Sequence, residues 1–260
     1  MSKAAEQESV LCGDSLNDLE ESMQYNEKEE IEKMLKEPEG LSEAQIEDLK
    51  EKQKIVNNSL LENKLYVDAK TNNLDIVPDI SAFAAGDRDV DKDRILLNMT
   101  QCEQKNSYYC GPATTRQTLL WINGSAPSQD KIAEGIGTTK DGTDGTKIVP
   151  YLNKKQKKRV YVISDSIDAV TIKSRIVTAI SSADAVPVIA RLKFDKGGDW
   201  EHETRGHYLN IAGYTTGMKK VYLTDPNITR VDPKAAGTYM VSFNSLHAAI
   251  KAHWTHHIYW

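Results

Sequence analysis

The chain has 260 residues and a formal net charge of −5, with 39% hydrophobic and 27% charged residues. These proportions are typical of one or two soluble globular domains with a hydrophilic portion. No run approaches 18 consecutive apolar residues, so we expect no transmembrane helix. The N-terminal residues lack the apolar core of a secretory signal, so the protein is either cytoplasmic or has lost its signal.

The charge is unevenly distributed along the chain. Residues 1–80 hold 9 basic and 20 acidic residues, a net −11, whereas residues 81–260 hold 24 and 18, a net +6. We therefore divide the chain into an acidic helical arm and linker (1–90) and a main domain (91–260). The arm could be a pro-segment or a regulatory segment.

Two charged helices are predicted in the arm. Residues 27–37 form the first, ended by Pro38 and Gly40. The second follows a capping box of Ser42 and Gln45. One face of it would carry Ile46, Leu49, Val56 and Leu60. These helices would dock weakly or stay apart. They could be a solvated spacer, an arm that covers a site, or a partner-binding helix.

After a linker or loosely attached strand at 66–94, the composition changes and helix and strand signals alternate. Helices are predicted at 112–122, 128–135 and 171–180. Strands are predicted at 160–164, 186–194, 206–214, 220–226, 238–243 and 256–260. Early helices followed by many strands predict an α+β fold with a mostly antiparallel sheet.

Three cysteines, Cys12, Cys102 and Cys110, are too few and too scattered for a disulfide framework, although one pair could form. Their spacing also fits no zinc knuckle or thioredoxin-type motif. Nothing around Cys102 resembles a site, so we interpret it as structural, and we interpret Cys12 as exposed in the arm.

Cys110 differs because it lies at the mouth of a predicted helix. Pro112 favours the first helical turn, since its missing N–H is not needed there. The N–H groups and positive dipole end of a helix stabilise a thiolate and lower the pKa of a cysteine below about 8.5. Gly111 would let the backbone turn closely at the sulfur.

A thiolate nucleophile needs a base, a group that orients the base, and an oxyanion donor. His207 begins a predicted strand, and a turn at 215–220 would return the chain so that Asp225 lies beside it. The Gln104 amide and the Cys110 backbone N–H would then hold the oxyanion. The alternatives are Asn227 or Asn210 as the orienting residue and Gln101 as the oxyanion donor.

The segments QKNSYYCGPATTRQTL, GHYLNIAGY and VYLTDPN resemble the C39-like branch of papain-fold cysteine peptidases. The resemblance extends over 95–260 and implies a papain-like fold with the catalytic helix packed on the sheet. It also implies that Gln104, Cys110, His207 and Asp225 are the oxyanion donor, nucleophile, base and orienting residue. A stand-alone member of this kind is often bacterial and exported, so an envelope location is one expectation.

Three residues near these positions are predicted to contact substrate: Tyr109, Trp200 and Gly206. Tyr109 could equally be a core residue, like its neighbour Tyr108. Trp200 could form the wall of a peptide groove or simply cap the sheet.

The sequence favours no metal site and no cofactor. The histidines of HWTHH, at 253–257, would point to opposite faces of a strand and have no acidic partner nearby. The basic run at 154–159 is interpreted as a solvated face, or else as an attractant for an anionic polymer such as an envelope glycopolymer. Nothing else indicates nucleic acid.

The sequence therefore predicts a cysteine peptidase that hydrolyses peptide bonds through a thioester acyl-enzyme, with a peptide or protein as substrate. A peptidoglycan amidase or endopeptidase, or an acyl- or transpeptidase, would use the same residues. A catalytically silent peptide-binding module is the third hypothesis.

Overall fold

The structure is a computed structural model of the chain, and it describes residues 25–71, 92–227 and 238–260, with the side chains of 60–71 left out. The helices are α1 (Glu27–Lys36), α2 (Glu43–Thr71), α4 (Cys110–Asn123), α5 (Gln129–Gly135), α6 (Ile148–Lys155), α7 (Ala169–Ser181) and α9 (Phe243–Ala252). The strands are β1 (Arg94–Ile95), β2 (Ile163–Ser164), β3 (Val188–Phe194), β4 (Thr204–Tyr214), β5 (Lys220–Thr224), β6 (Thr238–Ser242) and β7 (Ile258–Tyr259). Among the described residues, no helix is long and apolar enough to cross a membrane.

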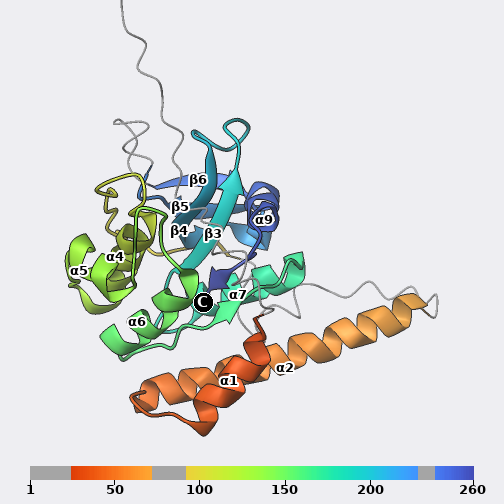
Figure 1. Ribbon diagram of the computed structural model, residues 1–260. Helices are drawn as coiled ribbons and strands as arrows, with labels where there is room; N and C mark the ends of the chain where they lie inside the picture. Colours follow the sequence, from red (N-terminus) through yellow and green to blue (C-terminus); the bar gives the residue numbers. More distant parts are fainter. Residues whose placement is uncertain (1–24, 72–91, 228–237) are drawn as a thin grey trace, which may run out of the picture.

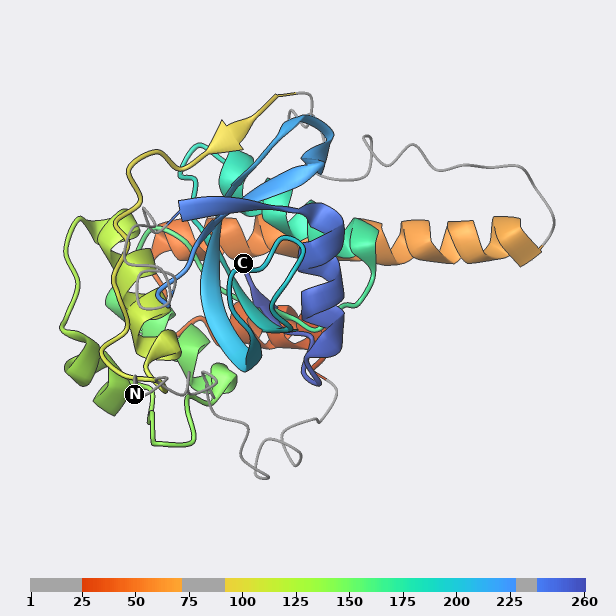
Figure 2. The same cartoon turned by 90° about the horizontal axis from the view of Figure 1, so that it is seen from above.

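The strands form one sheet in the order β2-β7-β3-β4-β5-β6, with β1 also paired to β4. Every described pair is antiparallel, which confirms the predicted α+β class. The sheet curves strongly, with α4 on one side and α9 on the other (Figure 1, Figure 2). Contacts of α4 with β4 and of α9 with β3 hold these layers together.

Most predicted elements are present with shifted ends. Ser128 caps α5 by accepting a hydrogen bond from the Lys131 N–H, as its position predicted. The predicted strand at 160–164 is ordered as a strand only at Ile163–Ser164. The helix α9 was missed, although Ser242 caps it through the Ser245 N–H. The missed helix α9 packs against β3.

The two arm helices pack against each other and against the rest of the molecule, and the end of α2 extends beyond it (Figure 1). The predicted capping box is present: the Gln45 N–H donates to Ser42 Oγ, and the Ser42 N–H donates to Gln45 Oε1. The expectation of weak docking is wrong for the described part of the arm, because its contact face is deeply buried. Leu49 and Val56 lie in that face as predicted. Ile46 is only half-buried, because the face is centred on other residues.

The contact face of α2 contains polar residues that the sequence pattern did not select. The buried Gln45 amide donates to the carbonyls of Asn153, Gln156 and Arg159. Asp48 accepts the Val160 N–H at 2.8 Å and pairs with Arg159 at 2.9 Å. Arg159, at the end of the basic run at 154–159, is therefore buried beneath the arm, whereas the four lysines of the run are exposed, as expected for a solvated face.

A second buried contact joins the arm to the C-terminal residue. Glu27 binds the Arg175 guanidinium through both carboxylate oxygens, at 2.9 and 3.0 Å, and accepts the Trp260 indole N–H at 2.6 Å. The Trp260 ring is fully buried, with Lys52 Nζ 3.9 Å and the Arg175 guanidinium 4.9 Å from its centre. Breaking such a buried ion pair by removing one partner costs about 3–5 kcal/mol.

Candidate active site

Cys110 is the first residue of α4, as the position of Pro112 predicted. It is fully buried, and the helix begins behind Tyr109, whose carbonyl accepts the Ala113 N–H at 2.9 Å. The side chain of Tyr109 makes no capping hydrogen bond to the first turn. The N–H groups of this turn therefore face the region of the sulfur, where the helix dipole favours negative charge.

The sulfur of Cys110 is disulfide-bonded in the structure, which differs from the expected free thiolate. Cys102 is free, and burial raises the pKa of its thiol. Cys12 lies outside the described residues. A thiolate is the form that enters thiol–disulfide exchange, so oxidation is compatible with a reactive cysteine. Chemistry at this sulfur requires that the bond first be reduced.

The helix α4 lies along β4 in a defined register. The Thr114 hydroxyl donates to the carbonyl of Tyr208 at 2.8 Å, and one turn later the Thr118 hydroxyl donates to Asn210 Oδ1 at 2.9 Å. Two residues of strand and one turn of helix have similar lengths, about 6.6 and 5.4 Å. Cys110 lies one turn before Thr114, so the same spacing places it beside the part of β4 that contains His207.

Gly111 is required for a reason other than the expected tight turn. It lies inside α4, in the ordinary helical region. A Cβ at this position would lie 2.4 Å from Thr143 Oγ1 and 2.8 Å from Thr143 Cβ. Thr143 is in turn held by the Thr138 hydroxyl at 2.8 Å. The glycine thus allows the segment before α6 to approach the first turn of α4.

His207 and Asp225 form a buried pair, as the predicted hairpin implied. The β4–β5 hairpin turns at the 3-10 helix Thr216–Met218 and places His207 Nε2 2.7 Å from Asp225 Oδ1. Both side chains are fully buried. Burial alone raises the pKa of Asp225, but the adjacent His207 and the hydrogen bonds outweigh it and lower this pKa to about 2. Asp225 is thus a carboxylate at neutral pH.

The two alternative orienting residues have other contacts. Asn210 donates to Gln117 Oε1 at 2.9 Å and to the Thr114 carbonyl at 3.2 Å, so its amide binds α4. Asn227 donates its backbone N–H to Asp225 Oδ1 at 2.8 Å. Asn227 therefore supports the Asp225 carboxylate through its backbone.

The loop before α4 holds Gln104 against the segment that follows Asp225. The Gln104 backbone N–H donates to the Pro226 carbonyl at 2.9 Å, and its side-chain amide donates to the Asn106 carbonyl at 2.8 Å. One N–H of that amide therefore has an intramolecular acceptor, and a second remains. Gln101, the alternative oxyanion donor, donates its side-chain amide to the backbone carbonyl of Asp225 at 3.2 Å.

The position of this loop depends on Gln129, which the sequence did not single out. Its amide oxygen accepts the Lys105 N–H at 3.1 Å, and its nitrogen donates to the Glu103 carbonyl at 2.7 Å. The same side chain thus anchors both neighbours of Gln104 to α5. Gln129 is the first residue after a helix cap, and no local pattern distinguishes this role.

The three predicted substrate-contacting residues lie in different environments. Tyr109 is half-buried and packs edge-on against Tyr108 at 5.3 Å. Gly206 is buried, and its N–H donates to Thr204 Oγ1. Trp200 is only 8% exposed and stacks on Phe194 at 3.9 Å. This burial favours the alternative in which Trp200 covers the sheet over the one in which it forms a groove wall.

A second histidine, also missed from the sequence, lies beside the pair. His202 Nε2 is 3.7 Å from Asp225 Oδ2, and its ring is edge-on to that of His207 at 5.6 Å. Burial lowers the pKa of His202 to about 4, so the imidazole is neutral at neutral pH. It lies in the loop between β3 and β4, packed against Phe194.

Among the described residues, His202, His207 and Asp225 offer ligand atoms within 4.8 Å of one another. Two ligands of a tetrahedral zinc ion with bonds near 2.05 Å are about 3.3 Å apart. The 2.7 Å contact between His207 and Asp225 is shorter than this and is already a hydrogen bond. The residues therefore fit a histidine–carboxylate pair better than a metal centre.

Two of the C-terminal histidines, His253 and His257, belong to the core. His253 Nδ1 accepts from the Thr255 N–H at 3.2 Å, and its ring stacks on Trp254. His257 contacts Tyr25 and Tyr259 edge-on. Burial lowers the pKa of His253 to about 2 and that of His257 to about 3, so both are neutral packing groups.

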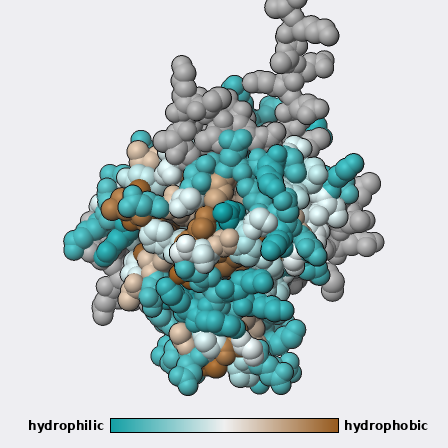
Figure 3. Space-filling view, turned by 90° about the vertical axis from the view of Figure 1, so that its left-hand side faces the viewer, coloured by the Kyte–Doolittle hydropathy of each residue, from teal (hydrophilic) through white to brown (hydrophobic). Residues whose placement is uncertain are grey.

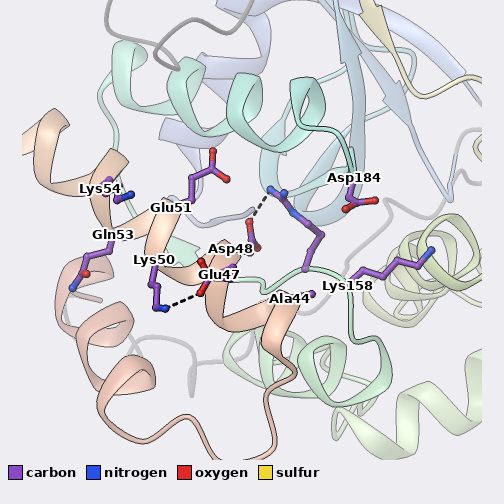
Figure 4. Close-up of a pocket in the computed structure, with 10 residues that line it drawn as sticks. Ala44, Glu47, Asp48, Lys50, Glu51, Gln53, Lys54, Lys158 and Asp184 are labelled. Atoms are coloured by element: carbon purple, nitrogen blue, oxygen red, sulfur yellow. Dashed lines mark hydrogen bonds and ion pairs between the residues drawn. The ribbon is translucent and has the colours of Figure 1, made fainter.

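A cavity of about 780 Å³ lies away from these residues, between α2 and the segment that contains Lys158 and Arg159 (Figure 4). Acidic and basic residues line it in equal number, and the Asp48–Arg159 ion pair closes one side. None of the predicted site residues lines it. The face that carries α4 and α5 is largely hydrophilic, with small apolar areas between polar side chains (Figure 3).

A cysteine-headed helix packed on a curved antiparallel sheet is the α+β architecture of papain-like peptidases. The model of the Peptidase_C39 like family matches residues 96–249, more than half of the chain, and the protein belongs to this family. The arm lies outside the matched region. A comparison with curated proteins finds no match.

Solved structures with similar folds include three peptidases. One is a putative C39-like peptidase from Bacillus anthracis, with 15% identity, a TM-score of 0.45, and coverage of 65% of this chain and 96% of that chain. The peptidase domain of Streptococcus ComA, a bifunctional ABC transporter of a quorum-sensing pathway, has 18% identity, a TM-score of 0.42 and coverage of 63% and 97%. A double-glycine-motif protease from an AMS/PCAT transporter, solved with a leader peptide, has 12% identity, a TM-score of 0.42 and coverage of 64% and 95%.

Proposed function

We propose that the protein is a cysteine peptidase whose nucleophile is the reduced thiolate of Cys110. The observation that supports this most is the buried His207–Asp225 pair at the end of β4, level with the start of α4. Family membership supports a peptidase, and the individual roles below are part of the proposal.

His207 acts as the base and then as the acid. Its Nε2–H donates to the charged Asp225, which leaves Nδ1 as the basic nitrogen. Nδ1 is buried and has no hydrogen-bond partner among the described residues. It would take the Cys110 proton, return a proton to the leaving amine, and then activate the water that hydrolyses the thioester.

The oxyanion is held by the remaining amide N–H of Gln104 and the backbone N–H of Cys110. The Gln104 backbone bond to Pro226, and the Gln129 bonds that hold its neighbours Glu103 and Lys105, support a preorganised donor. No cofactor is required by these steps. The acyl group of the same thioester could be transferred to an amine instead of water. The thioester could also form from a peptidoglycan peptide. The acceptor and the substrate are therefore tested separately.

The test compares Cys110→Ala with Cys102→Ala after reduction of the protein. A mixed peptide library and bacterial cell-wall fragments are incubated with each, and products are identified by mass spectrometry. Cys110→Ala should lose turnover by at least about a thousandfold, and Cys102→Ala should retain it. Omission of the reductant should also suppress turnover, because the sulfur is then blocked.

Turnover that persists in a folded Cys110→Ala protein would refute the proposal. Cleavage of wall fragments without cleavage of the library would assign the same chemistry to an envelope substrate. Binding of peptides without products from either substrate would favour the silent binding module.

A further inference from the structure

The Asp225 carboxylate has hydrogen-bond partners on both oxygens. Oδ1 accepts from His207 at 2.7 Å and from the Asn227 N–H at 2.8 Å. Oδ2 accepts from the Tyr239 hydroxyl at 3.0 Å. His202 lies 3.7 Å from Oδ2, which is beyond hydrogen-bond range. Among the described residues, Tyr239 is thus the hydrogen-bond donor to the oxygen that faces away from His207.

The sheet register explains why Tyr239 reaches this oxygen. Tyr239 on β6 pairs with Leu223 on β5, and Asp225 lies two residues beyond Leu223 on the same face. The site therefore extends across three adjacent strands, from His207 on β4 to Tyr239 on β6. A carboxylate held at one oxygen can rotate about its terminal torsion, and a donor on the second oxygen prevents this.

The chemistry of the contact also favours a fixed donor. Burial and the adjacent Asp225 charge raise the pKa of Tyr239 well above its usual value, so the phenol keeps its proton. Asp225 is ionised. At neutral pH the phenol therefore donates and the carboxylate accepts, as a charge-assisted hydrogen bond.

We propose that Tyr239 is a positioning residue that aims the Asp225 carboxylate at His207. The catalytic consequence rests on the proposed peptidase function, whereas the effect on Asp225 itself does not. Tyr239 touches no reacting atom in this scheme and acts through Asp225.

The experiment replaces one hydroxyl and follows the Asp225 titration directly. The variant is Tyr239→Phe, and the matched control is Tyr222→Phe, since Tyr222 alternates to the opposite face of the neighbouring strand. The ¹³Cγ resonance of Asp225, assigned by its absence in Asp225→Asn, is recorded against pH. Removing a donor to the charged form should raise the titration midpoint by about one pH unit in Tyr239→Phe and leave it unchanged in Tyr222→Phe.

A purely packing role for Tyr239 would lower stability without moving that midpoint, and such a result would overturn the proposal. Activity is a second readout: kcat should fall about tenfold in Tyr239→Phe with little change in KM. If the midpoint moves but the wild type cleaves no substrate, the positioning role holds and the peptidase proposal fails. If the midpoint is unmoved in an active enzyme, only the positioning role fails.

Discussion

At the scale of single residues, the candidate site depends on atoms that must approach closely. Asp225 is the clearest case, because its carboxylate gathers His207, Asn227 and Tyr239 in a fully buried position. Such a group must have its hydrogen bonds satisfied in the folded state. The sequence order predicted the histidine contact, but the tyrosine comes from a strand beyond it.

Gly111 gives a prediction at this scale. In Gly111→Ala the new Cβ would overlap Thr143, so we expect a loss of about 1–3 kcal/mol in the free energy of unfolding, measured with urea. Thr143→Ala should restore part of this loss in the double variant, because it removes the colliding hydroxyl and methyl. Equal losses in the single and double variants would show that another contact requires the glycine.

At the scale of elements, the helix α2 carries an unusual buried face. Leu49 and Val56 are apolar, but Gln45, Asp48 and Lys52 lie in the same interface. The Lys52 amino group has no hydrogen-bond acceptor among the described residues and lies over the Trp260 ring. Burial lowers the pKa of Lys52 to about 7, although Asp48 opposes this shift.

The Lys52 shift predicts how stability varies with pH. Because the pKa of Lys52 is about 7 when folded and near 10.5 when unfolded, the unfolded chain binds more protons between these values. This residue should therefore make the wild type more stable as pH rises from 7 to about 10. Lys52→Met should remove this slope and gain on the order of 3 kcal/mol near pH 7.

Urea unfolding at several pH values measures this effect, and exposed Lys54 provides the control variant Lys54→Met. An unchanged slope in Lys52→Met would mean that another group controls stability in this range. A lower stability of Lys52→Met at all pH values would mean that the ammonium–indole contact outweighs the cost of burying the charge.

At the scale of the whole molecule, the described arm is an integral part of the packed structure. Its contacts fall on the segment 153–160, on Arg175 and on Trp260. Among the described residues, these contacts do not include the candidate site. We therefore predict that the described arm helices contribute mainly to the stability of the domain that carries the site.

This arrangement predicts the outcome of truncation. Removing residues 1–71 should leave Arg175 without its carboxylate and expose Trp260, so the thermal midpoint should fall by at least about 10 °C. Removing residues 1–24 alone keeps every contact described for Glu27 and α2. It is the matched control when all three proteins are kept reduced, so that Cys110 is a free thiol in each. A shorter protein of unchanged stability and higher activity would instead identify the arm helices as an inhibitory segment.

The sequence alone determined the local features of this protein. Pro112 placed Cys110 at the start of a helix, and the alternating pattern around the 215–220 turn predicted the hairpin that joins His207 to Asp225. Both depend on residues close in the chain, where backbone preference and strand alternation are decisive. The resemblance to the C39-like family rested on the same segments.

Only the tertiary structure decided what lies against these segments. Gln129 anchors the Gln104 loop from a helix 25 residues away, and Tyr239 reaches Asp225 from the neighbouring strand β6. The arm docks through Gln45, Glu27 and other polar groups that look solvated in sequence, because their partners are distant carbonyls and a distant guanidinium. Hydrophobic periodicity reports which face is apolar, but it carries no signal for a buried polar group whose partner is remote in the chain.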